Sequence, residues 1–279
     1  MSDVRAFDTP GPVGLKLVLS SGQAEVSTTE TTRTEVELVA LRNDDATQKA
    51  IEEIEVGIRQ RGAGGHEVYV EQPKRSGFRF AFLRDPKISV RITCPHGAGL
   101  DASSGSLDLE AHGRLGDVSV KTASGDTSLE LVDGSCKVNS ASGDLFVRAV
   151  HGPSSVNTAS GDVHLGETYG RVTANLISGD LTIGDAHDSV SAATVSGDQD
   201  LESIRSGEVK LNAVSGDIRV AVARGVKLWI DANSVSGDMR SDLEVGDLPP
   251  ADDATLVQLR AKTVSGDVSI VRAATQVSA

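Results

Sequence analysis

The tripeptide Ser-Gly-Asp occurs eight times between residues 124 and 267, and this repeat constrains the fold more than any other feature of the chain. Successive aspartates are 18, 18, 18, 18, 19, 21 and 29 residues apart. A strict period that then lengthens by insertion is typical of stacked structural units. The aspartates are Asp126, Asp144, Asp162, Asp180, Asp198, Asp217, Asp238 and Asp267.

Each tripeptide lies between two apolar patterns of period two. Before it come an apolar, any, apolar triplet, two polar residues and an Ala, Ile or Val, as in Val190, Ala192 and Val195. After it comes a second triplet, as in Leu181 and Ile183. Such alternation predicts short strands with one buried face, and one unit alone cannot bury that face. We therefore predict an all-β fold, a parallel β-solenoid (β-helix) with about 18 residues per coil.

Two further columns of the repeat predict where each coil bends. Glycine precedes every aspartate of the tripeptide, where a residue without Cβ can adopt a positive φ. An asparagine recurs on the other side of the short strand, and we interpret it as a second bend whose stacked amides can hydrogen-bond between coils. The asparagines are Asn139, Asn157, Asn175, Asn212 and Asn233.

The repeat divides the chain into a regular and an irregular part. Residues 96–273 form the predicted regular solenoid, and residues 274–279 a tail. Residues 1–95 alternate less regularly, with a short helix expected near 44–53 and strands at 13–26, 34–41, 54–59, 67–70, 77–83 and 88–93. They can be irregular first coils, with the helix as an excursion, or a separate small sheet that caps the stack. Near the other end, residues 247–254 are expected to expand one coil into a loop.

Composition and charge exclude several classes of function. There are 27 Lys and Arg against 40 Asp and Glu, a net charge of −13, and eight aromatic residues. An acidic chain with so few rings is not expected to bind nucleic acid. With no apolar stretch long enough to cross a bilayer and no signal-peptide pattern, we expect a cytoplasmic protein. Cys94 and Cys136 show no metal or disulfide spacing and are expected in the core.

The chain resembles a bacterial family of unknown function whose members are named putative adhesins and carry β-strand repeats built on Ser-Gly-Asp. The resemblance rests on the eight tripeptides, on the segment 87–95 that leads into the first regular coil, and on Ser21-Gly22 near the start. It covers almost the whole chain. Membership implies a β-solenoid without enzymatic activity. Some similar bacterial proteins look like accessory factors of envelope-stress responses.

For the polar residues that recur in each coil, a structural role is better supported than metal binding, ice binding or catalysis. Stacked aspartates could bind calcium, but one carboxylate per coil supplies few of the six to eight oxygens that calcium takes. The outward positions of the two strands of each coil do not form the uniform threonine array that ice binding needs.

Asp200, Arg219 and Arg240 are expected on successive coils of one face. There they form a solvated ion-pair ladder or, less simply, the active site of a polysaccharide-acting enzyme. His151 and His187, two coils apart, are too distant to share a metal.

We therefore expect a non-enzymatic structural or interaction protein with no catalytic, metal or cofactor site, whose rigid solenoid presents flat faces to a protein partner of unknown identity. The alternation places Phe146, Tyr169 and Trp229 outside, and these, with the loop 247–254, are the candidate contacts. An adhesin-like surface protein is the alternative function. The solenoid ends could also pair between molecules and give homo-oligomers.

Overall fold

The computed structural model describes residues 2–42, 44–61, 64–73, 88–243 and 255–273. The contacts within the chain divide it into two compact units, residues 1–143 (unit 1) and residues 144–279 (unit 2). Both are built from strands around an aliphatic core, and the described residues contain one short helix. The predicted strand at 77–83 and the predicted loop at 247–254 lie outside the described residues.

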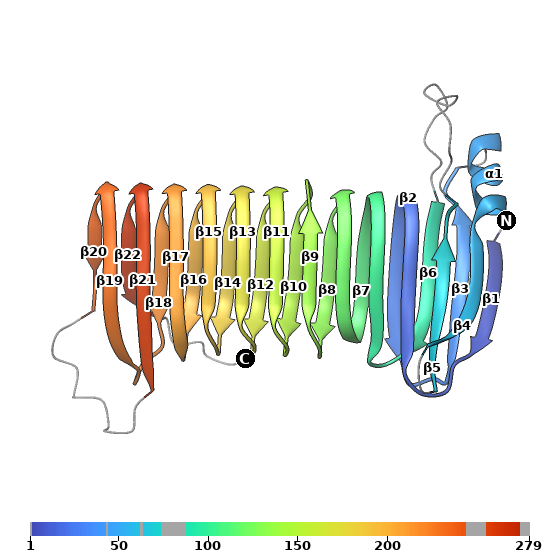
Figure 1. Ribbon diagram of the computed structural model, residues 1–279, viewed down its shortest axis with the longest axis horizontal. Coiled ribbons are helices and arrows are strands. Elements are labelled where there is room, and N and C mark those ends of the chain that lie inside the picture. Colours follow the sequence, from blue (N-terminus) through green and yellow to red (C-terminus); the bar gives the residue numbers. More distant parts are fainter. Residues whose placement is uncertain (1, 43, 62–63, 74–87, 244–254, 274–279) are drawn as a thin grey trace. The chain divides into compact units, whose positions relative to one another are not determined.

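Unit 1 combines parallel coils with antiparallel strands (Figure 1). Its strands are β1 (Ser2–Asp8), β2 (Val13–Thr29), β3 (Arg33–Ala40), β4 (Glu55–Arg61), β5 (Gly65–Glu71), β6 (Ile88–Pro95), β7 (Ala98–Ser124), β8 (Thr127–Val132) and β9 (Cys136–Ser140). The long strand β2 pairs in parallel with β5, β6 and β7, and β7 pairs in parallel with β8 and β9. By contrast, β1 with β3, β3 with β6, and β4 with β5 are antiparallel. The structure thus contains features of both interpretations of residues 1–95, and β1 was not predicted.

The predicted helix is α1 (Asp45–Glu53), and its start follows from local chemistry. The Asp44 carboxylate accepts a hydrogen bond from the Thr47 backbone N–H at 2.8 Å, which caps the first turn. Ala50 and Ile54 are buried, so one side of the helix packs against the protein. Among the described residues, no helix has the length and apolar character needed to cross a bilayer.

Unit 2 is a regular stack of parallel strands in two rows. The first row pairs β11 (Ser154–Ser160), β13 (Val172–Ser178), β15 (Val190–Ser196), β17 (Gly207–Ser215), β21 (Leu256–Ser265) and β19 (Lys227–Ser236) in that order. The second pairs β10 (Leu145–Val150), β12 (Val163–Thr168), β14 (Leu181–Ala186), β16 (Gln199–Ile204), β18 (Ile218–Val222), β22 (Val268–Arg272) and β20 (Met239–Ser241). Equivalent residues of neighbouring copies pair, as Leu145 does with Val163. The predicted parallel solenoid is confirmed.

The last two coils stand in the reverse of their chain order. Strands β21 and β22 pair with β17 and β18, and β19 and β20 then pair with β21 and β22 (Figure 1). The coil that comes later in the sequence therefore lies between its two predecessors. The gap of 29 residues between Asp238 and Asp267 therefore joins two coils whose spatial order is the reverse of their order in the sequence.

The glycine of each Ser-Gly-Asp tripeptide turns the chain as predicted. In all eight tripeptides its φ is positive, between 107° at Gly125 and 157° at Gly237. A Cβ at Gly197 would lie 2.1 Å from the Gly179 carbonyl oxygen, so both the conformation and the close approach require glycine.

The predicted bend at the asparagine column is wrong. No residue other than glycine has a positive φ within the described ranges, and Asn157 and Asn175 lie inside strands β11 and β13. Their side chains point outward and form the expected amide contact, with Asn175 Nδ2 donating to Asn157 Oδ1 at 3.0 Å. Asparagine stands here because it can form such a ladder on a sheet surface, not because the chain turns.

Candidate interaction surface

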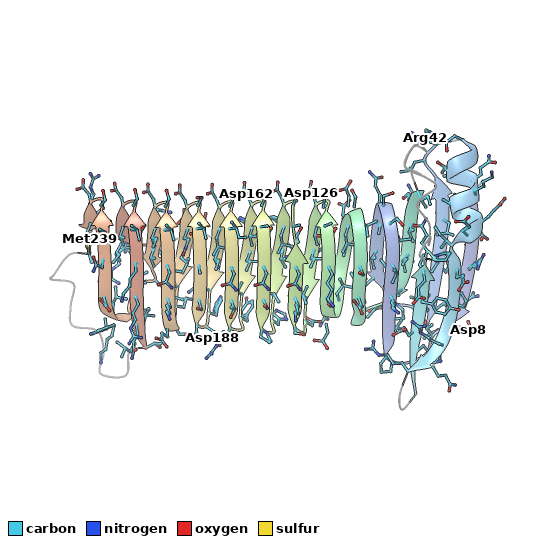
Figure 2. All side chains as sticks on the ribbon, turned by 45° about the horizontal axis from the view of Figure 1, so that its top comes forward. Asp8, Arg42, Asp126, Asp162, Asp188 and Met239 are labelled. Carbon is cyan, nitrogen blue, oxygen red and sulfur yellow. The ribbon has the colours of Figure 1, made fainter. Side chains whose placement is uncertain are left out.

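The aspartate column is a hydrogen-bonded ladder at the turn of each coil. The Asp144 carboxylate accepts a hydrogen bond from the Asp162 backbone N–H at 2.8 Å, and the same contact continues through unit 2 at 2.7 to 2.9 Å. It runs in spatial order, from Asp217 to Asp267 and then to Asp238. Figure 2 shows Asp162 where its coil turns. Each of these carboxylates up to Asp267 therefore accepts a hydrogen bond from a backbone N–H of the next coil, which is a structural role.

In unit 1 the ladder includes an aspartate that does not belong to a Ser-Gly-Asp tripeptide. The Asp126 backbone N–H donates to the Asp108 carboxylate at 3.2 Å. Asp108 follows Ser106-Leu107, so leucine replaces the glycine of the motif, and only its distance of 18 residues from Asp126 marks it as a member of the column.

Substitution at the ladder separates the structural role from cation binding. We expect Asp198→Ala to lower the free energy of unfolding by about 1 kcal/mol, because the Asp217 backbone N–H loses its acceptor. Asp198→Asn should lose much less, because its amide oxygen can still accept. Urea unfolding measures both. Equal losses in the two variants, or a midpoint raised by millimolar calcium in the wild type, would contradict the structural role. No group of three or more potential metal ligands occurs among the described residues.

The predicted triad of Asp200, Arg219 and Arg240 is wrong in one member. Arg219 Nη1 lies 2.9 Å from the Asp200 carboxylate on the neighbouring coil. Ser269, however, pairs with both Arg219 and Arg240, so it separates the two arginines. Arg240 instead contacts Asp238 at 3.3 Å. The reversed order of the last coils breaks up the cluster.

The three predicted aromatic contacts lie on the surface of unit 2, at separate places. Phe146 stacks on His164, with ring centroids 5.1 Å apart. Tyr169 lies between His151 and His187, at 5.0 and 4.4 Å. Trp229, on β19, lies beneath the Arg260 guanidinium at 5.6 Å. The structure does not bring these side chains into one site.

Charged groups surround the ring stack of Tyr169. The Tyr169 hydroxyl donates to Glu167 at 2.8 Å, and this hydrogen bond raises the pKa of Tyr169. Burial alone would raise the pKa of Asp185, but hydrogen bonds from Arg205 and Ser203 and the charge of Arg205 outweigh it. The pKa of Asp185 therefore lies below its usual value. The Arg205 guanidinium contacts this carboxylate at 2.6 Å.

The ion pair of Asp185 and Arg205 predicts a pH dependence of stability. Because the carboxylate pKa is lowered in the folded state, the pair stabilises above the unfolded pKa of about 4, and its contribution is lost as the pH falls through the folded pKa. Arg205 is half exposed, so we expect Arg205→Gln to cost only about 1 kcal/mol at pH 7. Below about pH 4 the difference from wild type should shrink. Urea unfolding at pH 7 and pH 3 measures this, with Arg219→Gln as a control at a more exposed pair. A difference that does not change with pH would contradict the assignment.

A row of exposed aliphatic side chains runs beside the aspartate ladder, and we name it the apolar ridge. Its five members are between 47% and 78% exposed and occupy five neighbouring coils of unit 2. The flanking serines, such as Ser178 with Ser196 and Ser215 with Ser265, pair in register, so the ridge residues follow one another coil by coil. In spatial order they are Ile177, Val195, Val214, Val264 and Val235.

The apolar pattern of the repeat predicts that the ridge residues are buried, and the structure contradicts this. The inward position is one residue earlier, where Thr194 and Thr263 are buried and donate hydrogen bonds to the carbonyl oxygens of Gly197 and Gly216. Strict alternation from Ala192 places Thr194 inside and Val195 outside, so the signal was in the sequence. The hydrophobicity of these side chains favours burial, but the period of the strand determines which way they point.

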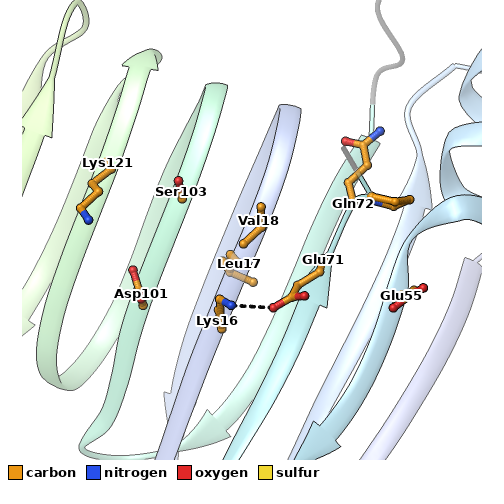
Figure 3. A pocket seen from close by; sticks show the side chains of 10 residues that line it. Lys16, Leu17, Val18, Glu55, Glu71, Gln72, Asp101, Ser103 and Lys121 are labelled. Atoms are coloured by element: carbon orange, nitrogen blue, oxygen red, sulfur yellow. Dashed lines mark ion pairs between the residues drawn. The ribbon is translucent and has the colours of Figure 1, made fainter. Parts of the chain in front are cut away.

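Unit 1 contains a shallow groove of about 480 Å³ whose lining is charged (Figure 3). Lys16 and Glu71 form an ion pair across it at 2.8 Å, and Asp101 and Lys121 lie on the neighbouring segments. Charges of both signs line the groove, which gives it no preference for a ligand of one charge.

The two cysteines are free and buried, as predicted, and burial raises the pKa of each thiol to about 12. Neither is a reactive thiol.

The fold and its ladders define a protein of the parallel β-solenoid class. Residues 15–271 match the model of the Toastrack DUF4097 family, and the chain belongs to that family. Comparison with curated proteins gives no match.

Two solved structures are similar to the chain over 97% of both lengths. One is described as a putative adhesin from Bacteroides fragilis, with 13% identity and a TM-score of 0.52. The other is described as a putative lipid binding protein from Parabacteroides distasonis, with 14% identity and a TM-score of 0.50. At these identities the likeness concerns the fold.

Proposed function

We propose that the chain is a non-enzymatic interaction protein and that the apolar ridge of unit 2 is its contact surface for a protein partner. The observation that carries this proposal is the row of five branched aliphatic side chains held in register outside the core. A contiguous apolar patch on a surface is typical of an interaction site. Because β-pairing fixes every member, little conformational entropy is lost on binding.

The charge beside the ridge favours a basic partner. The ladder carboxylates follow the ridge residues by three positions, and Asp180, Asp198 and Asp217 are exposed. The chain as a whole carries a net charge of −13. A partner with Lys or Arg beside an apolar stripe would match both rows, whereas an anionic lipid surface would be repelled.

The length of the ridge favours an amphipathic helix. Five coils at about 4.8 Å per step place the first and last members about 19 Å apart. A helix advances about 5.4 Å per turn, so its apolar stripe would stay close to the ridge over three to four turns. An extended strand repeats on one side only every 6.6 to 6.8 Å, which is a poorer match.

Paired variants test this proposal by affinity capture from the native host. We expect Val195→Ser/Val214→Ser to lose a partner that the wild type captures, and the capture to weaken at high salt. The matched control, Ala193→Ser/Asn212→Ser, changes outward positions two residues away on the same strands and should retain the partner. Thermal melting checks that all three proteins are folded. Identical captured proteins from both double variants would contradict the ridge as the contact surface.

An adhesin-like role at the cell surface is a second candidate, which the description of the Bacteroides structure suggests. The same rigid rows of side chains would then contact a ligand outside the cell. Cell fractionation distinguishes the two: an adhesin would be found at the surface, accessible to added protease, and a scaffold for an internal partner would not.

A further inference from the structure

The end coil of unit 2, β19 with β20, exposes residues that are buried in every other coil. Ile230 is 39% exposed and Met239 is 53% exposed. Figure 2 labels Met239 on the end coil. Their partners in the coil beneath, Leu259 and Val268, are 0% and 1% exposed. The interior of the stack is therefore open to solvent at this end.

Among the described strands, the end coil has a neighbour on one side only. Within the described residues, β19 pairs only with β21, and β20 pairs only with β22. In the part of the chain that the structure describes, no strand pairs with the outer edge of β19 over residues 228–236. An open edge above an exposed apolar interior requires a strand as its cover, because a helix or a lipid would leave the backbone groups without partners.

The edges of unit 1 are protected in a different way. Strand β1 is an edge strand that pairs with β3 alone in the described chain, and it carries Asp3, Arg5 and Asp8. Arg5 also donates to the Val56 carbonyl oxygen of β4 at 3.0 Å. Charged edge strands oppose pairing with another molecule. A head-to-tail contact of the end coil with unit 1 of a second chain is therefore disfavoured.

The end coil of a second copy has the same two strands and the same exposed interior, so it can pair with both edges and bury both apolar surfaces. We propose that two copies of the chain pair end to end through unit 2, with β19 antiparallel to β19 of the second copy about a two-fold axis. A two-fold axis normal to the sheet keeps inward residues inward, so Ile230 and Met239 of both copies join one continuous core. Antiparallel pairs match residues of the same face, as this requires. The interface uses the end of the stack, whereas the apolar ridge runs along its side.

Sedimentation velocity of the full chain over a concentration series tests the proposal. We expect the mass to rise from 29.0 kDa to 2 × 29.0 = 58.0 kDa as the concentration increases. Ile230→Lys and Met239→Lys place a charge into the shared core and should remain at 29.0 kDa throughout. Asn233→Lys, outward on the same strand, is the matched control and should dimerise like the wild type.

Circular dichroism confirms that each variant is folded, and the exposure of both sites in the monomer predicts that it is. A wild type that stays at 29.0 kDa at every concentration would overturn the proposal. So would dimers of Ile230→Lys as stable as those of the wild type, or open-ended growth beyond two chains. Loss of partner capture at the ridge would not affect this outcome, so the two proposals fail independently.

Discussion

Replacing Gly197 by alanine is expected to lower the free energy of unfolding by about 3 kcal/mol or more. The added Cβ would lie 2.1 Å from the Gly179 carbonyl oxygen, a distance that neither coil can accommodate without shifting backbone. The φ of 134° adds conformational strain for any residue that has a Cβ. Because equivalent turns are stacked, a displacement at one coil also disturbs the carboxylate ladder on both sides. Urea unfolding followed by circular dichroism measures the loss.

Gly225→Ala is the matched control for this prediction. Gly225 also has a positive φ, 79°, but no atom lies within 4 Å of the position of an added Cβ. Its substitution should cost only about 1 kcal/mol, the conformational part alone. If the two variants lost equal stability, close stacking of the turns would not be the reason for the glycine column.

Replacing Leu181 by alanine is the second change with a large expected effect, a loss of about 2 to 5 kcal/mol. Leu181 is 0% exposed and lies between Val163 and Gln199 of the adjacent coils. A cavity at this point removes contacts to both neighbours, and the rigid backbone of the stack can close it only in part.

Thr182→Ala, the next residue on the same strand, is the control. Thr182 points outward, so its change should alter the free energy of unfolding by less than about 0.5 kcal/mol. Thermal or urea unfolding of the two variants compares the faces of β14 directly. A larger loss at Thr182 than at Leu181 would contradict the assignment of inward and outward positions.

The repeat made the architecture predictable because each coil obeys the same two requirements. The chain must turn at a glycine, and alternate residues must enter a shared interior. These requirements are local, so the period of 18 residues, the parallel pairing and the role of the aspartates could be derived without coordinates. The antiparallel strands β1, β3 and β4 could not, since alternation does not distinguish parallel from antiparallel partners.

The order of the last two coils depends on which of them has the more apolar inward residues. Both carry the tripeptide, and either could pair with β17 and β18. The coil of β21 and β22 offers the more apolar interior, with Ile270 where the end coil has Ser241. Burial therefore favours the later coil in the middle and leaves the more polar one at the end. The serine at this inward position is the feature of the sequence that indicates the order.

The candidate surface was only partly predictable. The outward direction of Phe146, Tyr169 and Trp229 follows from alternation, but their separation into unrelated clusters depends on which coils are neighbours. The apolar ridge follows from alternation too, once period is given priority over hydrophobicity at Val195. The repeated residues are explained by turning, burial and stacking of the coils. They therefore carry no information about which partner binds the surface.

Disulfide formation between engineered cysteines tests the stacking of the coils most directly. Lys210 pairs with Arg260, and Arg260 pairs with Asp231, so the first two lie on adjacent coils and Lys210 and Asp231 are two coils apart. At about 4.8 Å per coil, only adjacent positions fall within disulfide reach. Under mild oxidation, Lys210→Cys/Arg260→Cys should cross-link and Lys210→Cys/Asp231→Cys should not, with the wild type and its buried thiols as background. The opposite result would contradict the reversed order of the last coils, and cross-linking of neither pair would contradict the stack itself.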